Sequence, residues 1–176
     1  MVIPGSISLT RIPVNEGVFI SPLRHGDAEA YWHLYQNAMV QRHFLESPFL
    51  PNETATGFVK RIMLSCDHIW SIRKSGDPHN IIGDCALHGL DEQAGSITIG
   101  CALLPEHWGE GIMTDVMRHV IDFAKTEYEL VQINAYTSKY NDNAIRLMQR
   151  LGFIEKAFAG GPERQFQLQL NNDALL

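Results

Sequence analysis

The chain has 176 residues, of which 45% are hydrophobic and 19% charged, and a formal net charge of -6 at pH 7. These proportions are ordinary for a globular protein, and the length suits a single domain over residues 1–176 with an N-terminal arm at 1–17. The acidic balance argues against a nucleic-acid-binding protein and is compatible with a cationic substrate. No run reaches the roughly 18 apolar residues of a membrane helix. We therefore expect neither nucleic acid nor membrane as a partner.

The cysteines and histidines do not indicate a disulfide framework or a metal site. Three cysteines are present, Cys66, Cys85 and Cys101, an odd number with no close pair. The eight histidines are scattered, and none forms the i, i+4 pair with a glutamate that is typical of a zinc protease. The first 17 residues lack the apolar core of a signal peptide. We expect a cytoplasmic protein with reduced cysteines and no metal.

The periodicity of apolar residues predicts strands and helices in alternation. The elements expected first are a short strand within 7–12, a strand over 18–20, a helix after Asp27, a helix over 52–65, and strands over 69–73, 81–90 and 96–103. Short polar turns separate the last three strands, so we expect an antiparallel meander. The remaining elements are a helix after Gly111, a strand over 131–136, a helix from Asn141 or Asp142 to a left-handed cap at Gly152, and strands over about 155–159 and 164–170.

The join between the strand over 96–103 and the helix that follows is the centre of the predicted site. Pro105 ends the strand because proline has no N–H to donate, and Gly109 and Gly111 let the backbone pass close to a ligand. The first N–H groups of a helix lack internal partners and lie at the positive end of its dipole. The join is therefore suited to a diphosphate. The alternative is a turn that merely needs two glycines.

Two common phosphate-binding loops do not fit this join. The dinucleotide fingerprint needs a third glycine where Thr114 stands, and the Gly-Lys-Ser/Thr of a Walker loop is absent. Residues 105–113, P-E-H-W-G-E-G-I-M, instead resemble the acetyl-CoA loop of the GNAT superfamily of N-acetyltransferases, in its RimJ/RimL-like branch. Glu106 stands where the general motif has glutamine or arginine, which we interpret as a marker of the branch. A second run over 141–153, N-D-N-A-I-R-L-M-Q-R-L-G-F, is similar to a motif at the same distance in RimJ/RimL-like chains.

The resemblance implies an α/β (α+β) fold of the GNAT type, with a central mixed, mostly antiparallel sheet of about six to seven strands and about four helices. It also implies acetyl-CoA as the co-substrate. The residues expected to bind it are Leu103, Leu104, Trp108, Gly109, Glu110, Gly111, Ile112, Met113 and Asn141. A backbone N–H near Leu103 would stabilise the negative charge that develops on the carbonyl oxygen.

The implied reaction transfers an acetyl group to a primary amine, of a peptide N-terminus or a small molecule, by direct attack in a ternary complex. It needs an acceptor for the amine's proton and an acid for the thiolate. Many members of the superfamily have a tyrosine acid where this chain has Met148, and the branch often has a serine where it has Ala144. Tyr140 and Tyr136 are the nearest substitutes, although both residue types more often serve packing.

Two alternatives to this mechanism stay open. The missing acid is an argument for an acyl-CoA-binding regulatory or sensor module that lacks turnover, whereas the complete cofactor loop and the effect of proximity support an enzyme. Cys101 suggests a covalent acetyl intermediate, although a buried strand cysteine is the simpler interpretation because nothing nearby activates its thiol. No motif identifies the amine, and a homodimer is a further open alternative.

Overall fold

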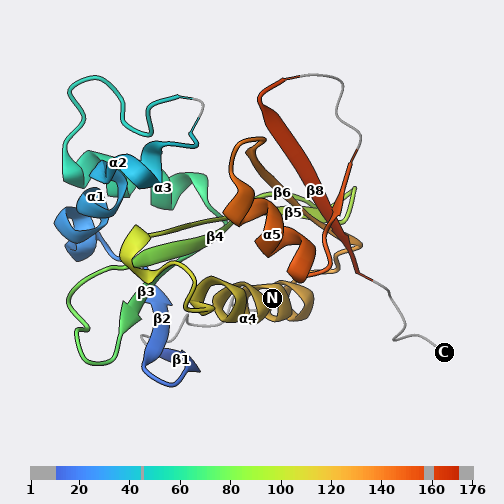
Figure 1. Cartoon of the computed structure of the whole chain (residues 1–176), viewed down its shortest axis with the longest axis horizontal. Helices are drawn as coiled ribbons and strands as arrows, with labels where there is room; N and C mark the ends of the chain where they lie inside the picture. The colour runs from blue at the N-terminus through green and yellow to red at the C-terminus, as the bar shows by residue number, and fades with distance from the viewer. Residues whose placement is uncertain (1–10, 45, 157–160, 171–176) are drawn as a thin grey trace, which may run out of the picture.

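The computed structural model describes residues 11–44, 46–156 and 161–170. Within these ranges the chain forms one eight-stranded sheet in the order β1-β2-β3-β4-β5-β6-β8-β7 (Figure 1). The strands are β1 (Ile12–Asn15), β2 (Val18–Pro22), β3 (His68–Lys74), β4 (Gly83–Asp91), β5 (Ser96–Leu103), β6 (Gln132–Ser138), β7 (Ile154–Glu155) and β8 (Glu163–Gln169). Neighbouring strands are antiparallel except β5 and β6, which run parallel.

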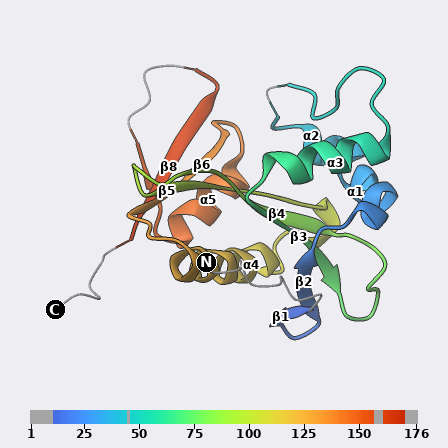
Figure 2. The same ribbon diagram turned by 180° about the vertical axis from the view of Figure 1, so that it is seen from behind.

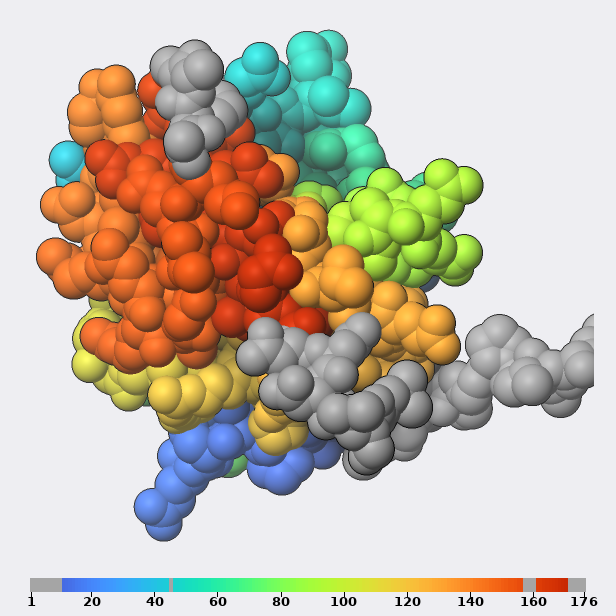
Figure 3. Space-filling view, turned by 90° about the vertical axis from the view of Figure 1, so that its right-hand side faces the viewer, coloured from blue at the N-terminus to red at the C-terminus, as the bar shows by residue number. Residues whose placement is uncertain are grey.

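The helices lie on both sides of the sheet. They are the 3-10 helices η1 (His25–Asp27) and η2 (Pro105–His107) and the α-helices α1 (Ala28–Gln36), α2 (Ala38–Gln41), α3 (Ala55–Ser65), α4 (Ile112–Glu127) and α5 (Asp142–Arg150). Helices α1 to α3 gather over one end of the sheet, whereas α4 and α5 lie on the opposite side (Figures 1 and 2). Figure 3 shows α5 and the C-terminal strands, in orange and red, covering the β8 side of the molecule. None of the described helices is long and apolar enough to cross a membrane.

Each helical layer packs its own hydrophobic core against the sheet. The larger core joins α4 and α5 to the sheet, and Val116, Met117 and Val120 of α4 are at most 1% exposed within it. The apolar stripe predicted for the helix after Gly111 therefore faces the sheet, as expected of an amphipathic helix. The smaller core lies under α1 and α3 and is centred on Phe58, which is fully buried.

Strands β5 and β6 stay paired over only three residue pairs, the last of which joins Thr98 to Asn134. β5 nevertheless continues over residues 99–103 and β6 over residues 135–138. The outer partners β4 and β8 remain paired with β5 and β6 along these continuations. The two strands therefore diverge, and we call the space between their continuations the β5–β6 opening. It leads along β5 towards the beginning of α4.

The structure confirms the predicted order of elements and corrects several boundaries. The strand expected within 7–12 falls mostly on residues 1–10, which lie outside the described residues; the first described strand, β1, shares only Ile12 with it and lies within the arm proposed at 1–17. The helix expected over 52–65 begins later, because the Thr54 hydroxyl accepts the Gly57 N–H and caps α3. The expected Gly152 cap is confirmed, since Gly152 has φ +85°.

The element counts exceed the prediction. Helix α2 was not predicted; it spans only four residues and is capped by the Asn37 side chain, which accepts two backbone N–H groups. The strand expected over 155–159 is the two-residue β7, and residues 157–160 lie outside the described residues. The described part of the chain thus has eight strands and five α-helices, where about six to seven and about four were expected.

Candidate functional site

The turn between β5 and α4 is held in shape by its own hydrogen bonds. The Trp108 indole Nε1–H donates to the Leu103 carbonyl oxygen at 2.8 Å, and the Trp108 backbone N–H donates to Pro105 at 3.1 Å. The Leu104 N–H donates to the Ile82 carbonyl at 2.8 Å. These contacts fix the end of β5 against η2, so the backbone N–H groups of Trp108 and Leu104 already have protein partners.

The next N–H groups form a cradle without a protein partner. Gly109 and Gly111 have φ values of +81° and +78°, which glycine adopts without steric cost. The first backbone hydrogen bond of α4 runs from the Asp115 N–H to the Gly111 carbonyl. No described residue accepts a hydrogen bond from the backbone N–H groups of residues 109–114. The five donors of residues 109–113, at the positive end of the helix dipole, form a cradle that can hold a diphosphate.

Basic side chains and one carboxylate lie around this cradle. The Lys74 ammonium lies 3.3 Å from one carboxylate oxygen of Glu110, and His107 Nδ1 lies 3.4 Å from the other. Hydrogen bonds from Lys74 and His107 hold the pKa of Glu110 below its usual value. From α5, the Arg150 guanidinium donates to the Thr114 hydroxyl at 3.3 Å. Lys74 and His107 are thus paired with Glu110, whereas Arg150 has no carboxylate partner among the described residues and adds positive charge beside the helix terminus.

The β5 edge of the opening offers further backbone donors. The Ala102 N–H donates to Asp84 Oδ1 of β4 at 2.8 Å and so points away from the opening. Because backbone groups alternate in direction along a strand, the N–H groups of Ile99 and Cys101 both point towards β6. The Ile99 N–H belongs to the last β5–β6 pair, which joins Thr98 to Asn134, whereas the Cys101 N–H lies beyond that pair and can donate to a carbonyl oxygen placed between the two strands.

Cys101 is exposed, so the expectation of a buried strand cysteine is wrong. Its strand neighbour β6 has already diverged at this level and leaves the residue uncovered. Although the residue as a whole is exposed, its sulfur makes a partly buried contact with the Met117 sulfur at 3.9 Å, and desolvation of the thiol, followed by the charge of Asp84, raises its pKa to about 12. The thiol therefore stays protonated at neutral pH, which does not suit a covalent nucleophile.

A buried carboxylate lies on the face of the sheet opposite α4, and the sequence analysis did not predict it. Asp84 is 2% exposed and accepts hydrogen bonds from the Tyr31 hydroxyl at 2.6 Å, the Tyr35 hydroxyl at 2.8 Å and the Ala102 N–H. Burial raises the pKa of Asp84 to about 6, and the three hydrogen bonds oppose that shift. Burial, followed by the charge of Asp84, raises the pKa of both tyrosines. The network ties α1 to β4 and β5.

Six aromatic rings pack around this network, and we call them the aromatic block. They are Tyr31, Trp32, Tyr35, Phe44, Phe49 and Phe58, with contacting ring centroids 4.0 to 5.8 Å apart. The ring of Phe44 stacks on Tyr35 at 5.8 Å and is 42% exposed. The aromatic block therefore reaches from the buried Asp84 to the surface, and its outer part comes from the segment between α2 and α3.

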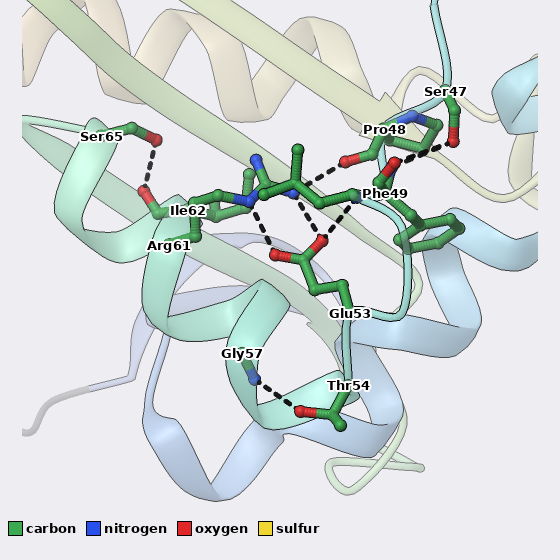
Figure 4. Close-up of polar contacts among 10 residues, drawn as sticks. Ser47, Pro48, Phe49, Glu53, Thr54, Gly57, Arg61, Ile62 and Ser65 are labelled. Atoms are coloured by element: carbon green, nitrogen blue, oxygen red, sulfur yellow. Dashed lines mark hydrogen bonds and ion pairs between the residues drawn. The ribbon is translucent and has the colours of Figure 1, made fainter.

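An ion pair fastens this segment to α3 (Figure 4). The Arg61 guanidinium donates to both carboxylate oxygens of Glu53, at 2.7 and 2.8 Å, and to the Pro48 carbonyl at 2.8 Å. The same segment carries Phe49, which packs on Trp32 at 4.0 Å. A bidentate pair fixes orientation as well as distance, so it holds this wall of the aromatic block in place.

The candidate acids lie on the β6 side of the opening. Tyr136 is 46% exposed on β6, and its hydroxyl accepts a hydrogen bond from Gln165 at 3.2 Å. Tyr140 is 70% exposed and follows β6 directly. Asn141 is confirmed as the N-cap of α5, where its side-chain oxygen accepts the Ala144 N–H at 3.2 Å. Its amide nitrogen makes no hydrogen bond to the described part of the chain.

Comparison with known proteins identifies the family of the chain. A family model described as an acetyltransferase (GNAT) domain matches residues 18–154. An uncharacterized N-acetyltransferase of Bacillus subtilis, YoaA, is 25% identical over 146 residues, which cover 81% of this chain and 80% of that protein.

Solved structures share the fold at low sequence identity. Spermidine N-acetyltransferase from Vibrio cholerae, in complex with CoA and spermine, has a TM-score of 0.72 at 20% identity and covers 88% of this chain and 96% of its own. RimL, a ribosomal L7/L12 alpha-N-protein acetyltransferase in complex with coenzyme A, has a TM-score of 0.77 at 12% identity. The match covers 93% of this chain and 100% of the RimL chain. Because the family model spans most of its length, the chain belongs to the GNAT acetyltransferase family and is an N-acetyltransferase.

Proposed function

We propose that the chain holds acetyl-CoA along the β5–β6 opening and transfers its acetyl group directly to a primary amine. The observation that carries the proposal is the position of the opening, which leads along β5 to the cradle of free N–H groups at residues 109–113. Leu103 lies about 13 Å from Ile99 along an extended strand, a distance that the pantetheine arm can span. The diphosphate then rests on the cradle and the thioester lies between β5 and β6.

The two sides of the opening have different roles in this proposal. The N–H group of Cys101 stabilises the carbonyl oxygen as it gains negative charge. The amine approaches from the side of the aromatic block, because α4 and α5 cover the other face of the sheet. The hydroxyl of Tyr140 or Tyr136 returns a proton to the departing thiolate, and Asn141 contacts the pantetheine arm through its free amide group. Holding amine and thioester together supplies most of the acceleration.

The acceptor class follows from the relatives and from charge. One relative is a spermidine acetyltransferase and another acetylates a ribosomal protein N-terminus, and both acceptors are amines. The net charge of -6 favours encounter with a cationic acceptor. We therefore propose either a polyamine or a basic peptide N-terminus as the substrate.

The test combines binding and turnover in one preparation. Calorimetry measures coenzyme A affinity, and a thiol reagent follows coenzyme A release from acetyl-CoA with spermidine, spermine and basic N-terminal peptides as acceptors. The proposal expects binding together with thiol release that depends on at least one amine. Binding with no amine-dependent release, or no binding, would contradict it.

A further inference from the structure

A patch without large side chains borders the β5–β6 opening on the side of the aromatic block. Strand side chains alternate between faces, so Asp84, Ala86 and His88 of β4 share this face. Ala86 pairs directly with Gly100 of β5, and both residues are partly exposed. Alanine and glycine thus form a bare floor, with Asp84 beyond one end and His88 beyond the other.

The bare floor lies at the level of β5 where its pairing with β6 ends. Thr98 is the last β5 residue paired with β6, and Gly100 is the next β5 residue on the same face. In the proposed function the reacting carbonyl lies at this level, because the Cys101 N–H, next to Gly100, is beyond the last β5–β6 pair and can donate to the carbonyl oxygen. An amine that reaches the carbonyl from the aromatic block therefore passes over Gly100.

The His88 imidazole leans over this floor. His88 pairs with Thr98, yet its Nε2 lies only 3.9 Å from the position that a Cβ would take on Gly100. In the described ranges, no hydrogen bond or ion pair engages the ring. A half-buried imidazole with an unused nitrogen thus faces the path of the amine.

The surroundings of the ring favour its neutral form. Burial lowers the pKa of His88, and the carboxylate of Asp67, before β3, opposes that shift. The neighbours across the sheet on this face, Thr98 and Asn134, carry no charge. A neutral imidazole at pH 7 can accept a proton.

We propose that the acceptor amine lies over Gly100 and that Nε2 of His88 takes up its proton. The inference rests on the proposed function and names the proton acceptor of the same reaction. The amine lone pair forms the N–C bond to the acetyl carbon, and the C–S bond breaks with its electron pair on sulfur. One proton moves from nitrogen to Nε2, and the thiolate takes its proton from a tyrosine hydroxyl or solvent.

The first experiment replaces His88 by glutamine, which keeps a polar side chain but accepts no proton at neutral pH. We expect His88→Gln to lower kcat about 100-fold, with an unchanged coenzyme A Kd and loss of the acidic limb of the pH–rate profile. His119→Gln, on the exposed face of α4, is the matched control and keeps wild-type rates. Wild-type kcat and an unchanged acidic limb in a folded His88→Gln variant overturn the proposal.

The second experiment adds a methyl group at Gly100, and its result does not depend on the stability of the histidine variant. A Cβ on Gly100 meets only His88 Nε2 at 3.9 Å, an ordinary contact, so Gly100→Ala folds. We expect the added methyl group to raise the KM for the amine about tenfold and to leave the coenzyme A Kd unchanged. Gly76→Ala, in an open turn, is the control. An unchanged amine KM in Gly100→Ala places the acceptor elsewhere and overturns the proposal.

The two proposals fail in different ways. If the wild-type chain releases thiol in the presence of an amine and the variants behave like the wild type, the roles proposed for His88 and Gly100 are wrong and the proposed function stands. If the wild-type chain releases no thiol with any amine, both proposals are wrong.

Discussion

Backbone groups form the candidate site on one side of the β5–β6 opening, whereas side chains form it on the other. On the α4 side the candidate site consists of backbone N–H groups from one continuous run, residues 109–113. On the other side it consists of side chains from separate elements, among them Tyr31, Asp84 and His88. A backbone site demands particular φ values and therefore leaves glycines in the sequence, whereas a side-chain site depends on which distant residues the fold brings together.

The backbone side is tested most strongly by Gly111→Val. A β-branched residue at φ +78° is strained and places methyl groups beside the cradle, so we expect coenzyme A affinity to fall about 100-fold or more. Gly17→Val is the matched control, because Gly17 has φ +92° and equally open surroundings but lies at the β1–β2 turn. Thermal melting measures the stability lost through backbone strain in each variant, and calorimetry measures its affinity for coenzyme A. Equal affinities of the two variants would show that the diphosphate binds elsewhere.

The side-chain side is tested by Asp84→Ala. The change leaves two tyrosine hydroxyls and a backbone N–H without their acceptor, so we expect the free energy of unfolding to fall by about 3 kcal/mol at pH 5. Because the folded-state pKa of Asp84 is raised to about 6, wild-type stability declines as pH rises from 4 through 6. The difference in free energy of unfolding between wild type and variant is therefore smaller at pH 8 than at pH 5. Asp122→Ala, on the exposed face of α4, is the control in denaturant titrations; a constant difference across pH would contradict the assignment.

The wall of the aromatic block is tested by Arg61→Met. Loss of the bidentate contact to Glu53 and of the bond to Pro48 is expected to lower the free energy of unfolding by about 2 kcal/mol. Arg61 holds the pKa of Glu53 below its usual value, so the contribution is present above that value and is lost as pH falls through the folded-state pKa. Lys60→Met, the exposed neighbour on α3, should melt like the wild type. Identical melting of both variants would mean that the pair does not fasten the wall.

The smallest effect is expected at Glu110→Gln. Removal of this carboxylate frees Lys74 and His107 to act on an anionic ligand, so coenzyme A should bind about twofold more tightly at low ionic strength. Glu129→Gln changes the net charge equally on an exposed residue away from the cradle. Titrations at two salt concentrations check the prediction, and an equal gain in both variants would reduce it to a general charge effect.

The contrast also explains what could be predicted from the sequence. The cradle and α4 were predictable because Gly109, Gly111 and the apolar stripe each leave a local pattern. Asp84 was not, since its partners Tyr31 and Tyr35 lie 53 and 49 residues earlier and only packing brings them together. Helix α2 and strand β7 span four and two residues, too few for a periodicity to show.

Early separation of β5 from β6 leaves a bare stretch of main chain inside the sheet. Unpaired strand edges attract other strands and promote aggregation. A molecule that fills the gap acts as a missing strand and, by mass action, raises the melting temperature of the protein. If acyl-coenzyme A is that molecule, the stability of the protein depends on the acyl-coenzyme A concentration, and the protein is lost faster when this concentration is low.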